Sequence, residues 1–463
     1  MDGARHELDR PDLAELLNAV MPRLETFLAG LEHAPVDGTR PSSTVPEFAP
    51  PDESGSELET LLDTVDSALA DAAETAGPGY FGYIPGGGLP SSAVGELMAR
   101  VTNRFTGIAD LAPSLVALEH SVLRWFATQF GFPKAAGGIL TTGGSQAMLS
   151  MIVTAREEHL DKHRLVNGRI YLSDQAHRSV QKAAHIAGFP RHAIRLVPTG
   201  DGRRIDPDEA KRFIDADRAA GYEPFLLVGS AGTTNSGSVD PLDELATLAA
   251  EERLWFHADG CYGGFFHLTS RGRAALTGIE RADSITLDPH KSLFLPYGTG
   301  ALLVRDAGTL VTAHSDEDPA DYLQDLAATG LVDYADQSSE LTREYRGLRV
   351  WLPLQLHGVA AFRDALDEKL DLARHAHDML AKHPALDVPE SPELSTVVFR
   401  LRDGDDDANH ALFRRVNQTG RFFWSSTRLD GRFTLRLCIL SFRTHREHVD
   451  AAIAEIVRNL PDT

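Results

Sequence analysis

The stretch FLLVGSAGTTNSGSVDPLDELATLAAEERLWFHAD, residues 225–259, contains a complete strand–helix–strand unit. Its first apolar run, 225–230, and its last, 254–259, have the length and composition of buried strands. Glycine, serine and proline mark a loop after the first run, and a helical stretch leads into the second. Units of this kind build parallel sheets, so the stretch predicts an α/β fold.

The same alternation continues on both sides of this unit, from about 138 to 305. Further apolar runs are GGILTT (137–142), RIYLS (169–173), AIRLVP (193–198), SITL (284–287) and GALLVR (300–305). Together the seven runs predict a mainly parallel seven-stranded sheet in a large domain, 81–360. After about 390, STVVFRL, a helix near 407–418 and FTLRLCIL predict a small α+β C-terminal domain, 361–463.

The N-terminal part, 1–80, is expected to be a helical segment with a proline-rich arm. Apolar residues recur at helical spacing through 11–32, where Pro22 must kink the helix or restart it. The arm, 33–56, is rich in Pro and Ser, and a second amphipathic helix is expected near 57–74. Helices placed on such an arm either pack on another subunit or form a local helical cap on their own subunit.

Composition excludes several classes of function. The formal net charge of −22 argues against binding nucleic acid, which requires basic surface. No apolar run approaches the ~18 residues that span a bilayer, and the N-terminus lacks the apolar core of a signal peptide. With only Cys261 and Cys438, a disulfide framework is not expected, so we predict a cytoplasmic protein. We predict no metal site.

Ligands of open α/β sheets sit at the carboxyl ends of strands, so the residues there were inspected first. TTGGSQA places Gly144 and Ser145 where a strand gives way to a helix, an arrangement that can hold a phosphate or form an ordinary turn and N-cap. SDQAHRSV places His177 after another strand, where an imidazole can stack on a flat ring or cap a helix.

Two further strand ends carry an acid and an amine. Asp259 ends an apolar strand, where a carboxylate needs a cationic partner such as a protonated pyridine nitrogen, or caps the turn that follows. Lys291, in DPHKS, can form a Schiff base with an aldehyde once it loses its proton. Phosphate cradle, stacking imidazole, acid and amine match the requirements of pyridoxal 5′-phosphate, which we predict as the cofactor.

With these motifs in place, the chain resembles the group II pyridoxal-phosphate decarboxylases, most closely the aromatic L-amino-acid decarboxylases. The resemblance extends over GPGYFGYIPGGGLP, SDQAHRSV, GTTNSGSVDPLDEL, HADGCYGG, DPHKS, LVDYADQS and RGLRVWLPLQLHG. It implies the aspartate aminotransferase-like (type I) fold, decarboxylation of an L-amino acid with an aromatic or bulky apolar side chain to its amine and CO2, and a homodimer with active sites at the interface.

The resemblance also implies roles for individual residues. Lys291 would hold the cofactor covalently, His290 would orient the carboxylate or relay protons, Asp259 would keep the ring nitrogen protonated and His177 would stack on the ring. The phosphate would be bound by Gly144, Ser145 and Ser284, with Gly358 reaching it from a partner subunit. Thr233 would contact ring substituents, Tyr334 would reprotonate the substrate carbon, and the substrate would lie against Tyr83, Ile84, Pro85 and Phe105.

The chain departs from the animal aromatic enzymes at three positions near these motifs. Asp288 stands where those enzymes have Asn, Ser292 where they have Trp, and Gly107 where they use an aromatic side chain donated across the dimer. A pocket altered in this way is expected to select a different side chain, because single methylenes are worth about 1–3 kcal/mol.

Other activities compete with simple decarboxylation. One is the oxidative decarboxylase, or aldehyde synthase, of the same family, in which the loop tyrosine or the stacking histidine is lost; Tyr334 and His177 are both present here. Another is a different pyridoxal-phosphate-dependent carbon–carbon lyase or an aminotransferase. A third is a non-catalytic pyridoxal-phosphate-binding regulator.

Overall fold

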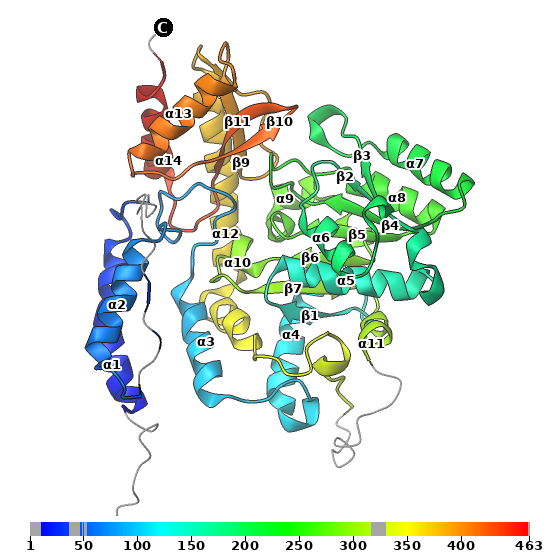
Figure 1. The fold of residues 1–463 in the computed structure, drawn as a ribbon, viewed down its shortest axis with the longest axis horizontal. Helices are drawn as coiled ribbons and strands as arrows, with labels where there is room; N and C mark the ends of the chain where they lie inside the picture. The colour runs from blue at the N-terminus through cyan, green and yellow to red at the C-terminus, as the bar shows by residue number, and fades with distance from the viewer. Residues whose placement is uncertain (1–10, 37–46, 49, 51–52, 316–329, 462–463) are drawn as a thin grey trace, which may run out of the picture.

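The computed structural model describes residues 11–36, 47–48, 50, 53–315 and 330–461. A seven-stranded sheet forms the centre of the large domain (Figure 1), and all seven predicted strands are present. The strands are β1 (Gly137–Thr141), β2 (Gly168–Ser173), β3 (Ile194–Val197), β4 (Glu223–Ser230), β5 (Trp255–Gly260), β6 (Ser284–Leu287) and β7 (Gly300–Val304).

The strand order is β1-β7-β6-β5-β4-β2-β3. Only β7 runs against its neighbours, since it pairs antiparallel with both β1 and β6 while the other pairs are parallel. The prediction of a mainly parallel sheet is therefore confirmed. Because β2, β4, β5 and β6 are parallel, their carboxyl ends open on the same edge of the sheet.

Helices cover the sheet and account for the completely buried central strands. α5 packs on β1, β4, β6 and β7, whereas α7 and α8 pack on β4 and its neighbours. The α-helices from residue 113 to residue 314 are α4 (Pro113–Gln129), α5 (Gly144–His159), α6 (Ser179–Ile186), α7 (Pro207–Ala219), α8 (Leu242–Glu252), α9 (Ser270–Ala275), α10 (Pro289–Ser292) and α11 (Gly308–His314).

A second hydrophobic core forms the small domain. Its antiparallel sheet has the order β10-β11-β9-β8 and is joined by two helices. These elements are β8 (Leu386–Asp387), β9 (Thr396–Leu401), β10 (Ser425–Leu429), β11 (Arg432–Cys438), α13 (Asp406–Gln418) and α14 (Arg446–Arg458). Phe81 also belongs to this core, where its ring lies 5.6 Å from that of Trp424.

The long helix α12 (Gly347–Ala381) passes from one core to the other, with Phe362 in the first and Leu372 in the second. Gly358 interrupts it, because its backbone has φ 73° and ψ 155° instead of helical angles. Residues 359–381 therefore form a separate helical segment with its own N-terminus.

The N-terminal helices α1 (Leu13–Gly30) and α2 (Leu58–Ala70) lie side by side at the left of Figure 1, joined by ion pairs from Arg23. α3 (Pro90–Thr102) instead packs on α12. Pro22 lies inside α1, so of the two expected alternatives, a kink or a restart, the restart into a second helix does not occur. Neither α1 nor α2 has a buried residue.

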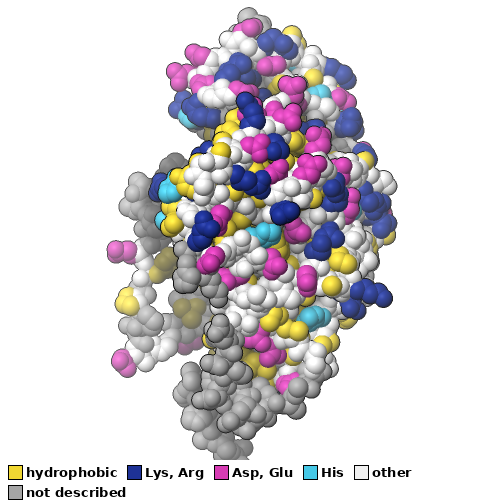
Figure 2. Space-filling view, turned by 90° about the vertical axis from the view of Figure 1, so that its right-hand side faces the viewer, with side chains coloured by type: hydrophobic (Ala, Val, Ile, Leu, Met, Phe, Trp, Pro, Cys, Tyr) yellow, Lys and Arg dark blue, Asp and Glu magenta, His cyan; other side chains and the backbone are white. Residues whose placement is uncertain are grey.

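The surface carries both charges. On the face shown in Figure 2, Lys and Arg side chains are interspersed with Asp and Glu, and they form no continuous basic patch there. Within the described part of the chain, no helix is both long and apolar enough to span a membrane.

Candidate cofactor site

Lys291 lies directly beyond the carboxyl end of β6, in the short helix α10. Its Nζ is 2.8 Å from Oδ2 of Asp288, whose side chain is 3% exposed. Burial alone would lower the pKa of Lys291, but the Asp288 carboxylate outweighs burial and raises that pKa above its ordinary value. Lys291 is therefore an ammonium ion until its proton is removed.

Asp259 ends β5, the strand next to β6. Its Oδ1 accepts hydrogen bonds from the Cys261 backbone N–H and the Thr286 hydroxyl, both at 3.1 Å. Burial opposes ionisation, but the nearby His257 and the hydrogen bonds from Cys261 outweigh it and hold the pKa of Asp259 below its usual value. An ionised, buried carboxylate of this kind is suited to a cationic ring nitrogen.

His177 follows β2 at the same edge of the sheet. Its Nδ1 lies 2.8 Å from the Ser179 hydroxyl and accepts the Ser179 backbone N–H at 3.3 Å. Burial lowers the pKa of His177, with the charges of Asp259 and Lys291 acting in opposite directions. A neutral imidazole held by its Nδ1 presents a flat face that can stack on a ring.

The turn from β1 into α5 forms an anion cradle. Gly143 has φ 149°, which glycine adopts without strain. A Cβ on Gly144 would lie 2.4 Å from Sγ of Cys261 and 2.9 Å from Oδ2 of Asp288, so only glycine fits there. Ser145 is exposed in the first turn of α5, where backbone N–H groups point outward.

Two adjoining cavities meet at Lys291. One, of ≈ 250 Å³, is lined by Gly144, Ser145, Asp288 and His290, and the other by Thr233 and Asp259; His177, Cys261 and Lys291 line both. The space thus has an anion cradle at one end, a carboxylate at the other and an amine between. These residues fit pyridoxal 5′-phosphate, whose phosphate and ring nitrogen lie at opposite ends of the molecule.

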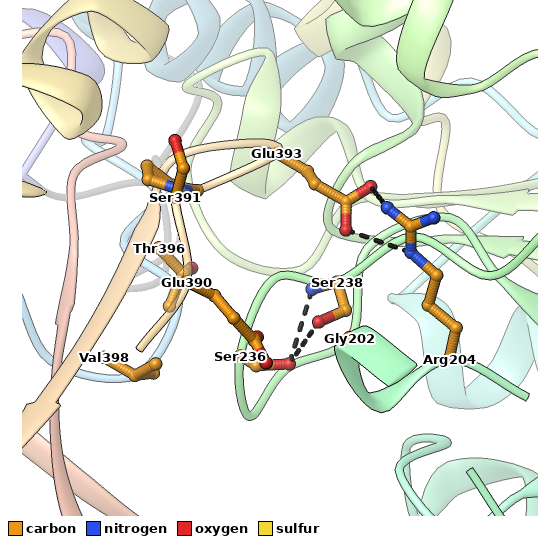
Figure 3. Close-up of a pocket in the computed structure, with 10 residues that line it drawn as sticks. Gly202, Arg204, Ser236, Ser238, Glu390, Ser391, Glu393, Thr396 and Val398 are labelled. Atoms are coloured by element: carbon orange, nitrogen blue, oxygen red, sulfur yellow. Dashed lines mark hydrogen bonds and ion pairs between the residues drawn. The ribbon is translucent and has the colours of Figure 1, made fainter. Parts of the chain in front are cut away.

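Thr233 is fixed by its surroundings. Its backbone N–H donates to the Ser238 carbonyl at 2.8 Å, and its hydroxyl lies 2.9 Å from that of Ser236. Ser236 and Ser238 also line a separate polar pocket between the two domains, where Arg204 pairs with Glu393 at 2.8 Å (Figure 3). The hydroxyl contacts of Ser236 with Thr233 and Ser238 hold the loop that carries Thr233.

His290 lies beside Lys291 and faces the same cavity. Its Nδ1 donates to the Thr299 carbonyl at 2.6 Å, which leaves Nε2 as the nitrogen able to exchange a proton. Burial lowers the pKa of His290, partly offset by Asp288. A neutral His290 can therefore accept a proton.

The expected substrate segment passes next to this turn. A Cβ on Gly86 would lie 2.3 Å from the His290 carbonyl oxygen, so Tyr83, Ile84 and Pro85 lead directly to the lysine turn. Tyr83 has φ 49° and is 64% exposed, with its ring centroid 6.1 Å from that of Phe423. The segment therefore passes next to the lysine turn, although Tyr83, Ile84 and Pro85 line neither of the two cavities.

The structure contradicts the phosphate role predicted for Ser284. Ser284 begins β6, so it lies at the strand end opposite Lys291, and it is completely buried. Its hydroxyl contacts Trp255 Nε1 at 2.7 Å and His257 Nδ1 at 2.8 Å. Ser292 is also buried, and its hydroxyl donates to the Tyr262 carbonyl at 2.8 Å.

Besides Ser284 and the segment Tyr83, Ile84 and Pro85, three more predicted residues line neither cavity of their own subunit. Tyr334 is buried elsewhere, with its ring stacked on His120 at 5.3 Å. Phe105 packs beside Gly107, where a Cβ would meet its ring at 3.0 Å. A Cβ on Gly358 would have no described atom within 4 Å.

Two residues of the site escaped the sequence analysis. Cys261 lines both cavities, and its spacing of two residues from Asp259 was the available signal. Asp288 was noted only as a departure from relatives, although it forms the ion pair of Lys291.

Comparison with known proteins agrees with this geometry. The sequence model described as the pyridoxal-dependent decarboxylase conserved domain matches residues 43–402. The chain is 34% identical to an aromatic-L-amino-acid decarboxylase from Bacillus atrophaeus, over 80% of this chain and 79% of that protein. It is 30% identical to tryptophan decarboxylase 2 from Oryza sativa subsp. japonica, over 97% and 95%.

A phenylacetaldehyde synthase from Arabidopsis thaliana is 28% identical, over 87% of this chain and 86% of that protein. Among solved structures, Oryza sativa TDC with PLP and tryptamine superimposes with a TM-score of 0.90 at 26% identity, over 98% of this chain and 99% of the other. The type I fold expected from the sequence is thereby confirmed.

Proposed function

Since the chain belongs to the pyridoxal-dependent decarboxylase family, we propose that it converts an aromatic L-amino acid into the corresponding amine and CO2. One observation carries the proposal: Lys291 lies in a cavity that has the Gly144 cradle at one end and the Asp259 carboxylate at the other. Pyridoxal 5′-phosphate is the cofactor, and in this reaction it supplies a sink for the electrons released as the carboxylate leaves.

The chain's own residues prepare that step. Lys291 must transfer its ammonium proton before it can form a covalent bond, and His290 Nε2 is a neutral acceptor beside it. Asp259 would hold a positive charge at the ring nitrogen of the bound cofactor in a buried position, where the interaction is strong. His177, held by its contacts with Ser179, would stack on the cofactor ring.

The apolar segment next to the lysine turn supports an aromatic substrate. It includes Tyr83 and Ile84, and the Phe423 ring lies beside that of Tyr83. Arg436 does not face this space as a free cation, because it donates to the carbonyls of Tyr83 and Thr234 at 2.9 and 2.6 Å. A substrate with a neutral ring is better suited to these apolar surroundings than one with a charged side chain.

We further propose that two copies form a homodimer and complete each other's sites. Burial raises the pKa of Tyr334 well above 10, so its phenol keeps the proton that a donor needs. Tyr334, Phe105 and Gly358 lie away from the cavities of their own subunit. We therefore propose that they contribute to the site of a partner subunit. Proton delivery by Tyr334 requires its segment to move or to serve that partner.

The N-terminal helices support the same dimer. Apolar side chains on α1 and α2 are exposed, with Leu24 48% and Phe27 42% accessible on the first and Leu61 and Val65 on the second. Such a face is stabilised when a second copy covers it. Cys261 and Cys438 are both free thiols, which fits the reducing cytoplasm that we propose as the compartment.

The direct test is release of CO2 from each proteinogenic amino acid by the purified enzyme with pyridoxal 5′-phosphate, with Lys291→Ala as the blank. We expect CO2 and amine in equal amounts from one or more aromatic substrates. Aldehyde, ammonia and hydrogen peroxide formed together with CO2 would instead indicate the oxidative reaction. Keto acid without CO2 would overturn decarboxylation.

A further inference from the structure

Behind Asp259, one face of the sheet carries polar residues where an apolar core is expected. Trp255, His257 and Asp259 alternate along β5, and Ser284 and Thr286 alternate along β6. The strand register sets His257 opposite Ser284 and Asp259 opposite Thr286, so all five side chains share this face. His257, Ser284 and Thr286 have no exposed surface.

These side chains form one continuous hydrogen-bonded chain. Trp255 Nε1 lies 2.7 Å from Ser284 Oγ, which lies 2.8 Å from His257 Nδ1. On the other side of the imidazole, Nε2 lies 3.2 Å from Thr286 Oγ1, which lies 3.1 Å from Asp259 Oδ1. Each polar group on the path therefore has its partner, as buried groups require.

The two ends of the chain determine the direction of every bond. An indole N–H can only donate and an ionised carboxylate can only accept. Thr286 therefore gives its one hydroxyl proton to Asp259 and must accept from His257, so the imidazole carries its proton on Nε2. Nδ1 is then the acceptor of the Ser284 hydroxyl, which in turn accepts from Trp255.

We propose that Trp255, Ser284, His257 and Thr286 are positioning residues that form a one-way donor relay ending on Asp259. The relay fixes the Nε2–H tautomer of His257, and it holds Asp259 as an oriented carboxylate for the cofactor ring nitrogen. Hydrogen bonds aligned in one direction polarise each other, so the polarisation that begins at Trp255 reaches Asp259 through Ser284, His257 and Thr286.

The other groups around the relay are consistent with a neutral imidazole. Burial lowers the pKa of His257 to about 4, despite the nearby Asp259 charge. Asp259 also faces the Cys261 thiol and N–H, and His177 and the Lys291 ammonium lie on the cofactor side. The role in cofactor binding rests on the proposed function, whereas the tautomer does not.

The first experiment therefore uses cofactor-free protein. Magic-angle-spinning NMR of protein labelled with 15N-histidine reads the tautomer directly, and the His257 signals are those lost in His257→Gln. At pH 7 we expect Nε2 protonated and Nδ1 unprotonated. Thr286→Val removes the acceptor of Nε2 and should move the proton towards Nδ1, whereas Thr286→Ser keeps the hydroxyl and should leave the tautomer unchanged.

A wild-type His257 that is doubly protonated at pH 7, or that carries its proton on Nδ1, would overturn the relay without any variant. A Thr286→Val spectrum identical to wild type would do the same. Should Thr286→Val fail to fold, Ser284→Ala is the second variant. Thr286 still accepts from Nε2 in it, so the proton should stay on Nε2, and a proton found on Nδ1 would overturn the relay.

The second experiment uses holoenzyme containing pyridoxal 5′-phosphate labelled with 15N in the ring. We expect a protonated ring nitrogen in the wild type and in Thr286→Ser. In Thr286→Val the more basic Asp259 should draw the shared proton towards itself, displacing the ring signal towards the unprotonated value. An unchanged ring signal in Thr286→Val overturns the relay, whereas no cofactor binding by the wild type overturns the proposed function instead.

Discussion

At the scale of single residues, Asp288 has two opposing effects on Lys291. The carboxylate holds the amine in place at 2.8 Å, but it also keeps the amine protonated. Asparagine at this position would retain the shape without the charge. Loss of the Lys291 proton is therefore expected to slow the first step of cofactor attachment in this chain.

Asp288→Asn should make that step faster. We expect the rate of pyridoxal 5′-phosphate attachment to cofactor-free enzyme at pH 7 to rise by roughly tenfold, since one unit of pKa is a factor of ten in deprotonated amine. Stopped-flow absorbance of the cofactor measures the rate. Asp174→Asn, an exposed carboxylate three residues before His177, is the control, and equal rates in all three proteins would refute the role of Asp288.

His257 makes stability depend on pH. Burial lowers the pKa of His257 to about 4 in the folded protein, whereas the pKa of a histidine in an unfolded chain is near 6.5. The unfolded state therefore binds more protons between these values, and stability falls as the pH drops through that window. Urea denaturation should show a loss of about 2 kcal/mol from this residue between pH 7 and 5.

His257→Gln provides the comparison for this measurement, because glutamine cannot acquire the charge. The variant should lose less stability than the wild type over the same pH interval. The same dependence on pH in both proteins would show that His257 is not buried as a neutral imidazole.

At the scale of elements, the β1–α5 turn depends on the absence of a side chain at Gly144. A Cβ there would overlap Cys261 and crowd Asp288. Gly144→Ala should therefore lower the affinity for pyridoxal 5′-phosphate by about tenfold or more while the protein remains folded, since overpacking costs about 1–3 kcal/mol. Cofactor titration followed by absorbance tests this.

Gly30→Ala, at the end of α1, is the matched control, because a Cβ there would have no described atom within 4 Å. It should bind the cofactor like the wild type. A Gly144→Ala variant with unchanged affinity would show that the cradle is not at this turn.

The strand elements also show what sequence can and cannot predict. The apolar runs identified all seven strands of the large sheet, and the residues after β1, β2, β5 and β6 converge at one edge because parallel strands end together. Ser284 was misplaced because its role was taken from the family resemblance, although it begins the strand whose carboxyl end leads to Lys291. Its partners Trp255 and His257 come from the neighbouring strand, a contact that only register determines.

At the scale of the whole molecule, the positions of Tyr334, Phe105 and Gly358 could not follow from the sequence of one chain. Their expected roles came from resemblance, and in a single subunit they lie away from Lys291. The helices α1 and α2 likewise lack packing partners for their apolar faces within one subunit, since no residue of either helix is buried.

Disrupting that face should separate the subunits. Leu24→Asp combined with Phe27→Asp places two charges on the apolar side of α1, so we expect sedimentation as a monomer and loss of most CO2 release. Val166→Asp, at a residue 63% exposed in the large domain, should leave both unchanged. A wild-type monomer with full activity would rule out shared active sites.

The central claim is that Lys291 carries the cofactor. Reduction of the holoenzyme with borohydride makes that bond permanent, and peptide mass spectrometry then locates the added pyridoxyl group. We predict one modified lysine per chain, Lys291, and no modification at that site in Lys291→Ala. A pyridoxyl group found mainly on another lysine, or on none, would contradict the account.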